Sequence, residues 1–299
     1  MTQPIDILCV GSVLWDIIGR TDTNLSERGD MAGRISRLPG GVAMNIAMTL
    51  VRFGMRPALL TSVGLDPEGH ELLDSARAFG LDVDFVHRAS HLPTDRYMAI
   101  EDATGLVAAI ADAHSLEAAG DAILAPLADG RLGSSAAPWS GLIALDGNLT
   151  AELLEVIAVS PLFSDADLRI APASPGKAER LRPVMHHPNA TLYVNLQEAG
   201  ILCTTTFANS TDAAKGLVGA GAARALVTDG GNAASDAGSG LETLTHPAPK
   251  IQPRRITGAG DTFMAAHIFA ENRGANRSDA LIRAQAAAAA YVAYDEDQT

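Results

Sequence analysis

Short apolar runs alternate with segments of helical periodicity along most of the chain. The runs with the length of buried strands are residues 5–10, 57–63, 141–145, 168–171, 192–194 and 225–228. The segments with apolar positions at helical spacing are residues 42–53, 66–80, 150–159, 177–181 and 278–294. Strands that alternate with helices in this way form parallel sheets with helices on both faces. The pattern therefore predicts an α/β fold with a doubly wound, mostly parallel sheet flanked by helices.

Two segments interrupt this alternation. Residues 21–33 are polar and rich in Asp, Asn and Gly, which is typical of a loop or a hairpin crossing. The pattern of residues 93–113 indicates a hairpin of two short strands, which can join the first segment in a small sheet outside the main one. We therefore expect one domain over residues 1–299, with a small β-sheet inserted from about 16–38 and 93–113.

A glycine-rich turn near the C-terminus precedes an apolar helical pattern. Its residues are Thr257, Gly258, Ala259, Gly260 and Asp261. Small residues let the backbone come close to a ligand, and the first amides of the helix are free to bind an anion such as phosphate. A carboxylate repels a bound phosphate, so Asp261 has a separate task here. It either caps the helix or acts as a general base for a substrate hydroxyl.

A glycine pair near the N-terminus, Gly40 and Gly41, opens the first predicted helix. Asn45 lies one turn into that helix, and its amide offers a donor and an acceptor that suit sugar hydroxyls. The alternative is an ordinary helix start with an exposed Asn. Asp16 follows the first predicted strand and Gly11. Its carboxylate either accepts hydrogen bonds from a vicinal diol or belongs to a simple turn.

These stretches resemble the two signatures of the ribokinase (PfkB) family of sugar and nucleoside kinases. Residues 257–263 are similar to the C-terminal signature, and residues 40–47 are similar to the glycine-pair signature that carries an Asn. The resemblance covers nearly the whole chain and implies a ribokinase-like fold. In that family the small sheet is a lid that closes over the sugar and often pairs between subunits, so we expect a homodimer through the lid.

The resemblance also implies a reaction, the ATP-dependent phosphorylation of a primary hydroxyl. Asp261 would remove the hydroxyl proton, while the backbone of Gly258, Ala259 and Gly260 would stabilise charge on the transferred group. The residues that match the family's substrate contacts are Asp16, Gly40, Gly41 and Asn45.

The nucleotide side rests on further matches to the family. Residues 195–198 resemble its Asn-x-x-Glu motif, and Gly230 matches its Thr-x-Gly motif. The implied nucleotide contacts are Asn195, Thr228, Gly230 and Thr257. Mg²⁺ prefers oxygen ligands and keeps several waters, so Glu198 is expected to hold it through water. Alternatively, Asn195 and Glu198 form a helix cap with an acidic first turn.

Asp146 and Asn148 follow a predicted strand in the middle of the chain, where a doubly wound sheet binds ligands. Each either contacts substrate or caps the next helix, and for Asn148 we expect the cap. Residues 172–177 and 34–47 are similar to stretches of pseudouridine kinases. This implies a contact of Lys177 with a base or phosphate, although many lysines are only solvated. Pseudouridine is thus the leading acceptor, with ribose, other nucleosides and fructose phosphates as alternatives.

The composition excludes some partners. The chain has 22 Lys and Arg against 35 Asp and Glu, a formal net charge of −13, and no basic run that would follow a nucleic-acid backbone. No segment has the pattern of a signal peptide or a membrane span. Cys9 and Cys203 lie in apolar patterns and are expected to be buried and reduced. We therefore expect a cytoplasmic protein whose partners, besides a second copy of the chain, are small molecules, with no nucleic acid and no membrane among them.

Two other functional classes remain. A non-catalytic sugar or nucleoside sensor of the same fold would not need Asp261 with both glycines. A dinucleotide-dependent oxidoreductase would need a Gly-x-Gly-x-x-Gly fingerprint after the first strand, which does not follow Gly11. The chain also departs from the family at Arg255, where members commonly have an Asp tied to a monovalent-cation site. This departure puts potassium activation in question.

Overall fold

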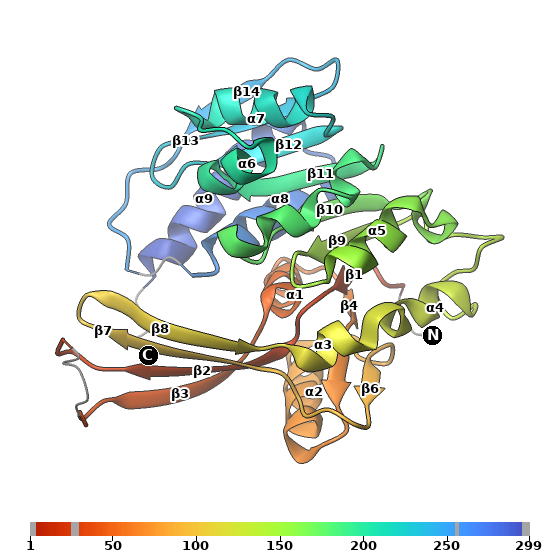
Figure 1. The fold of residues 1–299 in the computed structure, drawn as a ribbon. Coiled ribbons are helices and arrows are strands. Elements are labelled where there is room, and N and C mark those ends of the chain that lie inside the picture. Colours follow the sequence, from red (N-terminus) through yellow and green to blue (C-terminus); the bar gives the residue numbers. More distant parts are fainter. Residues whose placement is uncertain (1–3, 25–29, 255–256, 295–299) are drawn as a thin grey trace.

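An eight-stranded sheet forms the centre of the molecule (Figure 1). The structure is a computed structural model that describes residues 4–24, 30–254 and 257–294. In spatial order the strands are β14 (Leu244–Pro247), β13 (Ala233–Gly238), β12 (Arg224–Thr228), β11 (Ala190–Asn195), β10 (Asp167–Ala171), β9 (Leu142–Asp146), β1 (Ile7–Val10) and β4 (Pro57–Leu60). The strands from β12 to β4 are parallel, and β13 and β14 are antiparallel. The predicted fold class is confirmed.

Helices cover both faces of this sheet. One face carries α1 (Val42–Arg52), α2 (Pro67–Phe79), α8 (Ala259–Asn272) and α9 (Arg277–Ala293). The other carries α3 (His114–Ala119), α4 (Ala125–Ala128), α5 (Ala151–Val159), α6 (Leu196–Cys203) and α7 (Ser210–Gly219). Short 3₁₀ helices lie at η1 (Gly120–Leu124), η2 (Pro161–Phe163), η3 (Pro175–Leu181) and η4 (Val184–His186).

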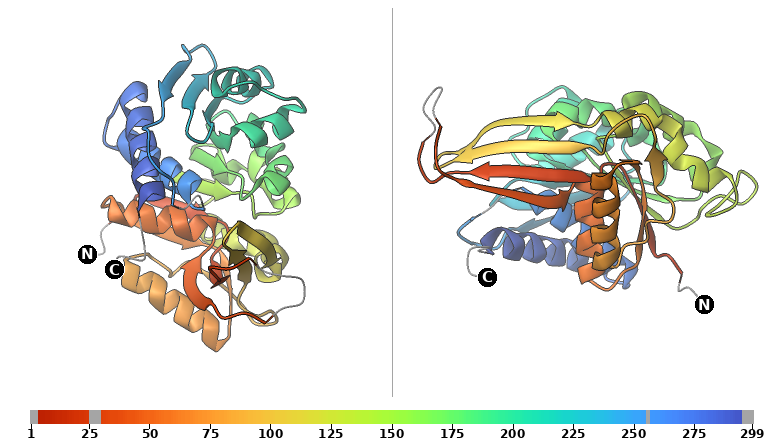
Figure 2. Two further views of the ribbon diagram at one scale, coloured as in Figure 1. Left: turned by 90° about the vertical axis from the view of Figure 1, so that its left-hand side faces the viewer. Right: turned by 90° about the horizontal axis from the view of Figure 1, so that it is seen from below.

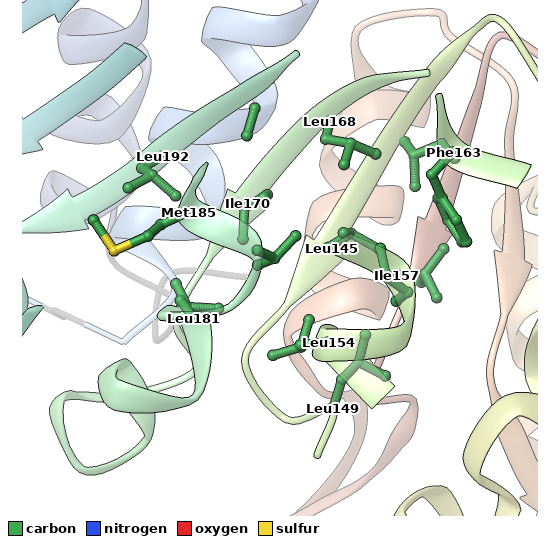
Figure 3. Packing of buried hydrophobic residues seen from close by; sticks show 14 of the residues in the cluster. Leu145, Leu149, Leu154, Ile157, Phe163, Leu168, Ile170, Leu181, Met185 and Leu192 are labelled. Atoms are coloured by element: carbon green, nitrogen blue, oxygen red, sulfur yellow. The ribbon is translucent and has the colours of Figure 1, made fainter. Parts of the chain in front are cut away.

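Each central strand supplies side chains to two separate cores. Ile7 and Cys9 of β1 enter the core beneath α1 and α8, whereas Leu8 and Val10 enter the core on the other face. This second core is shown in part in Figure 3, where α5 residues pack against β9 and β10. Because both faces are covered, the strands are continuous apolar runs without polar alternation.

A second sheet extends to one side of this body (Figure 2). Its four strands have the spatial order β3 (Arg34–Gly40), β2 (Leu14–Arg20), β7 (Arg96–Asp102) and β8 (Gly105–Asp112). We call it the small sheet. The prediction of a separate sheet from these segments is confirmed, while its function as a lid stays a prediction. A two-strand pair, β5 (Ser62–Gly64) with β6 (His87–Ala89), lies apart from both sheets.

Two buried carboxylate contacts join the small sheet to the body. The Asp95 carboxylate, just before β7, accepts hydrogen bonds from the Ser115 and Leu116 amides of α3 at 2.8 and 3.0 Å. The Asp66 carboxylate caps α2 and also accepts from the Thr94 amide at 2.8 Å. The base of the β7–β8 hairpin is therefore fixed to the body, and Arg96 at the start of β7 also pairs with Glu68 of α2 at 2.7 Å.

The predicted elements differ from the structure in three places. The apolar run 57–63 is divided between β4 and β5, and the helix expected near Lys177 is the 3₁₀ helix η3. The strands β13 and β14 were not predicted, because Ala, Ser, Asp and Gly make up nearly all of β13. Among the described residues, no helix combines the length and the apolar character that crossing a bilayer requires.

Candidate active site

The candidate site lies where β1 and β9 end and two helices begin. In the sheet, β1 lies between β4 and β9. The next strand of this sheet along the sequence, β4, pairs with β1 on one side, and β9 pairs with it on the other side. Such a reversal of strand order leaves a crevice at the carboxyl ends of the strands, where doubly wound folds bind ligands. The helices that begin near this crevice are α1 and α8, from opposite ends of the sequence.

Asp261 and Asn45 meet at this crevice. The Asn45 side-chain amide donates a hydrogen bond to Asp261 Oδ2 at 3.0 Å, so the two signature stretches are in direct contact. Asp261 lies in the first turn of α8, but the N-cap is Gly258, and no side chain caps the helix. The capping alternative for Asp261 is therefore wrong. Within the described residues, the Asn45 amide is the side-chain hydrogen-bond donor to the Asp261 carboxylate.

The first turn of α8 presents unused amides. Within the described part of the chain, the N–H groups of Ala259, Gly260 and Asp261 make no hydrogen bond to another residue. Gly258 has φ 85°, and a Cβ at this position would lie 2.5 Å from Tyr291 Oη, so the turn requires glycine. Thr257 is exposed beside it. Free amides at the positive end of a helix form a site for an anion. Arg255 lies outside the described residues.

The first turn of α1, by contrast, is already occupied by protein groups. The Val42 amide donates to Ser12 Oγ at 2.9 Å, and the Ala43 amide donates to Asp146 Oδ2 at 3.1 Å. The Met44 amide donates to the Ser12 carbonyl at 3.3 Å. Because these amides are satisfied, the anion site of the crevice belongs to α8 and not to α1.

Asp146 is the centre of this α1 contact. Its side chain is fully buried and also accepts from the Ser12 amide at 2.7 Å and from the Asn148 amide at 2.6 Å. Burial raises the pKa of its carboxyl group, and the hydrogen bonds from Ser12, Asn148 and Ala43 oppose that rise. In this conformation Asp146 supports the loop after β1, and its direct contact with substrate stays a prediction.

Asn148 does not cap a helix, so that expectation is wrong. The cap of α5 is Thr150, whose hydroxyl accepts from the Leu153 amide at 3.2 Å. Asn148 instead donates to Ser12 Oγ at 2.8 Å and accepts from Lys177 Nζ at 2.5 Å. Lys177 is half-buried, and this burial lowers the pKa of its ammonium group. The network brings Lys177 to the edge of the crevice.

Asp16 lies on β2 against the glycine pair. A Cβ on Gly40 would overlap the Asp16 carboxylate, and a Cβ on Gly41 would lie 2.5 Å from the Ser12 carbonyl. Gly41 also has φ 95°, which favours glycine. Burial raises the pKa of Asp16 to about 6. The structure therefore brings together the predicted acceptor residues around one end of α1.

Several carboxyl groups lie close together around the crevice. Burial raises the pKa of Asp261 to about 7, and the nearby Asp146, Asp16 and Glu198 carboxylates add to the rise. The hydrogen bond from Asn45 acts in the opposite direction and favours the ionised carboxylate. A group with this pKa exchanges its proton near neutral pH, as a general base does.

Three of the four predicted nucleotide residues line an adjoining open cavity of about 940 Å³, whereas Thr257 does not. Its lining includes Asn195, Gln197, Thr204, Thr205, Thr228 and Gly230. Asn195 and Glu198 form a capping box at the start of α6, so the helix-cap alternative is confirmed for both. Glu198 Oε2 accepts from the Asn195 amide at 2.8 Å, and burial raises the pKa of Glu198 to about 7. Among the described residues, no group of three or more His, Cys, Asp or Glu is placed to hold a metal ion directly.

The comparisons with known proteins agree with this geometry. The family model of the pfkB family carbohydrate kinases matches residues 4–299. The chain belongs to the pfkB family. It is therefore a phosphotransferase that acts on an alcohol group of a sugar or nucleoside. The resemblance inferred from the two signature stretches is confirmed.

Relatives of this pfkB kinase include enzymes with nucleoside and sugar acceptors. Pseudouridine kinase of Escherichia coli is 29% identical over 269 residues, which cover 87% of this chain and 81% of the relative. A nucleoside kinase of Methanothermobacter thermautotrophicus is 33% identical over 85 residues, 28% of each chain. The structure of Arabidopsis thaliana ribokinase with ribose and ATP has a TM-score of 0.78 at 18% identity, covering 98% of this chain and 94% of that one. A carbohydrate kinase from Agrobacterium tumefaciens has a TM-score of 0.79 at 25% identity, covering 96% and 90%.

Ser12 is a site residue of this pfkB kinase that sequence reasoning missed. It accepts from α1 and Asn148 and donates to Asp146 at 3.1 Å, so it joins β1, β9 and α1. The sequence feature that could have indicated Ser12 is its position directly after Gly11, at the end of the first strand. A hydroxyl there can satisfy backbone amides that a buried helix start leaves unpaired.

Gly11→Ala tests this support beneath the crevice. Gly11 has φ 148°, and an added Cβ would overlap the Asp146 carboxylate, displacing it from its amide donors. We expect the free energy of unfolding to fall by about 2–3 kcal/mol, measured by urea denaturation. The control is Gly240→Ala, with φ 71° and nothing within 4 Å of the added Cβ, which isolates backbone strain from overlap. Equal losses in the two variants would contradict the proposed support.

Proposed function

We propose that this pfkB kinase transfers the terminal phosphoryl group of ATP to the primary hydroxyl of a ribosyl substrate, with pseudouridine as the leading acceptor. The observation that carries the proposal is the 3.0 Å contact of Asn45 with Asp261 beside the free amides of α8. It places a carboxylate of raised pKa between an acceptor side at α1 and an anion site at α8. The acceptor is suggested by the Escherichia coli relative, which covers most of the chain.

On the acceptor side, Asp16 and Asn45 hold sugar hydroxyls near the glycine pair. Asp16 accepts hydroxyl hydrogen bonds, while Asn45 is oriented by its bond to Asp261. Lys177, oriented by Asn148, lies at the edge of the crevice and contacts the base. The four carboxylates around the site disfavour an anionic acceptor, since like charges repel strongly at partly buried positions. An uncharged nucleoside or sugar therefore suits this site better than a sugar phosphate.

On the phosphoryl side, Asp261 takes the hydroxyl proton as the acceptor oxygen approaches phosphorus. The amides of Gly258, Ala259 and Gly260 stabilise charge on the transferred group. Asn195, Thr228 and Gly230 bind the nucleotide at the adjoining cavity, and Thr257 contacts it from the turn before α8. Glu198 has one oxygen bonded within its capping box, and the other suits a hydrated cation. Mg²⁺ held there through water would neutralise the nucleotide phosphates.

Asp261→Asn tests the proposed base. We expect turnover with ATP to fall by about 10²–10⁴-fold or more, because the amide cannot accept the hydroxyl proton. ATP affinity, measured by calorimetry, should change little. The control is Asp279→Asn, which removes a carboxylate from the corresponding position in the first turn of α9. The assay compares pseudouridine, uridine and ribose. Wild-type turnover retained by Asp261→Asn would remove Asp261 from this role.

The pH dependence of kcat/KM tests the same assignment in the unchanged protein. Because Asp261 must be ionised to accept a proton and burial raises its pKa to about 7, kcat/KM should increase as the pH rises through about 7. The contribution of Asp261 to folding stability depends on pH in the opposite direction. A carboxyl group with a raised pKa in the fold binds its proton more tightly than in the unfolded chain, so its contribution declines as the pH rises from 3.8 to about 7. A flat kcat/KM profile across this range would exclude the assignment.

We further propose a homodimer formed through the small sheet. Strand pairing places Met98 beside Ile110, and Ile35 lies two positions along the same face. This face lies opposite the one that carries Asp16. It is apolar yet open to solvent, with Ile35 82% and Ile110 69% exposed. Burial of such a face favours association.

Ile110→Asp tests this association by light scattering after size exclusion. We expect a dimeric wild type and a monomeric variant, because a charge in an apolar interface is costly to desolvate. The matched control, Ile282→Asp, places the same charge at a half-exposed Ile on α9. A monomeric wild type, or dimers in all three proteins, would overturn the proposed interface.

A further inference from the structure

A layer of charged and polar side chains lies inside the core between α8 and the sheet. Its members are Arg169 of β10, Tyr193 of β11, Arg224 of β12, and His267 and Glu271 of α8, which we call the α8 anchor. His267 is fully buried, and Tyr193 and Arg169 are only 5% and 7% exposed. At the other helices of this face, the strands present mainly aliphatic side chains. The anchor is therefore a local exception within an apolar core.

The hydrogen bonds of the α8 anchor form a continuous chain. Arg169 Nη1 donates to Tyr193 Oη at 3.0 Å, and the Tyr193 hydroxyl lies 2.8 Å from His267 Nδ1. A guanidinium group only donates, so Tyr193 Oη accepts from Arg169, and the same hydroxyl also bonds to His267 Nδ1. Within the described residues, His267 Nε2 has no partner.

Ion pairs attach the second half of α8 to two strands. Glu271 contacts Arg169 at 2.5 Å and Arg224 at 2.8 Å. Arg224 continues to the fully buried Asp236 of β13 at 2.7 Å, and Asp236 also pairs with Arg277 at the start of α9. The helix is thus bonded through two of its residues to three different strands, and through them to the neighbouring helix.

Stability alone does not account for this arrangement. Burying charges and an unpaired imidazole nitrogen costs free energy, and well-packed apolar groups in their place are often as stable. Directional bonds do specify one position of a helix, whereas a layer of Ala, Leu and Ile lets a helix slide at little cost. The start of α8 has no side-chain cap and a glycine at its first position outside the helix. Apart from the Asn45–Asp261 contact at its first turn, the polar side-chain contacts described above that hold α8 against the sheet come from its second half.

We propose that the α8 anchor sets the axial position of α8, so that Tyr193, His267 and Glu271 are positioning residues for Asp261 and the free amides at the helix start. The proposal rests on the role given to Asp261 above. Phosphoryl transfer depends on placement of the reacting groups, and a shift of about 1 Å is enough to cost about 10²-fold in rate. The anchor thus links the interior of the sheet to the geometry of the crevice.

Tyr193→Phe tests the proposal by removing a single oxygen atom. We expect kcat to fall by about 10–100-fold while the KM values for ATP and acceptor change by less than about twofold. Hydrogen exchange of the first hydrogen-bonded amides of α8, at residues 262–265, should become faster. The matched control is Ile268→Val, a buried apolar truncation on the same helix. It lowers stability without touching the anchor and should leave kcat and these amides unchanged.

Three outcomes would overturn the proposal. The first is a wild-type kcat and wild-type exchange rates in Tyr193→Phe. The second is an equal fall in kcat and an equal rise in exchange rate in Ile268→Val. The third is wild-type behaviour of Glu271→Asp, which is the second variant if Tyr193→Phe does not fold. The exchange measurement needs no substrate. Faster exchange at residues 262–265 in an enzyme that phosphorylates none of the acceptors would support the anchor and reject the proposed function.

Discussion

The hydrogen bond between Asn45 and Asp261 is the contact on which the candidate site depends. It joins the first turn of α1 to the first turn of α8, two helices that lie far apart in the sequence and side by side on one face of the sheet. An amide beside a buried carboxylate lowers the cost of ionisation and fixes the direction in which the free oxygen points. One short contact therefore sets the starts of α1 and α8 relative to each other, and with them the proposed acceptor and phosphoryl sides of the crevice.

The two helix starts at the crevice differ in what occupies their amides. At α1, the Ser12 and Asp146 side chains accept hydrogen bonds from the first amides. In the proposed reaction, this helix offers Asn45 and the glycine pair to an uncharged ligand. At α8, glycines take the place of a capping side chain, and the amides remain open. The two N-cap glycines also differ in conformation, with φ 95° and ψ 149° at Gly41 and φ 85° and ψ −2° at Gly258. In the proposed reaction, the start of α1 serves the acceptor and the start of α8 serves the anion.

The sequence was sufficient to predict the fold class and the approximate place of the site. Alternating apolar runs have few solutions other than a parallel sheet covered by helices, and glycines followed by Asn45 or Asp261 indicate helix starts near a ligand. The direction of individual side chains was not predictable. Asp146 turns inward to backbone amides, and Asn148 binds Ser12 and Lys177, because the loop after β1 brings donors that are distant in sequence. The α8 anchor was missed for the same reason, since its members come from four separate elements.

In the proposed reaction, the hydrogen bond from Asn45 holds Asp261 in its ionised form, so that Asp261 can act as the base. The most direct test is the kcat/KM profile against pH for Asn45→Ala, compared with the wild type and with Asn276→Ala, which removes an amide from the start of α9 instead. The loss of the Asn45 hydrogen bond should raise the pKa that governs the acid limb of the profile, because that bond favours the ionised form of Asp261. Asn276→Ala should leave this pKa unchanged. An acid limb that stays at the wild-type pKa in Asn45→Ala would show that the group controlling catalysis is not the carboxylate that Asn45 contacts.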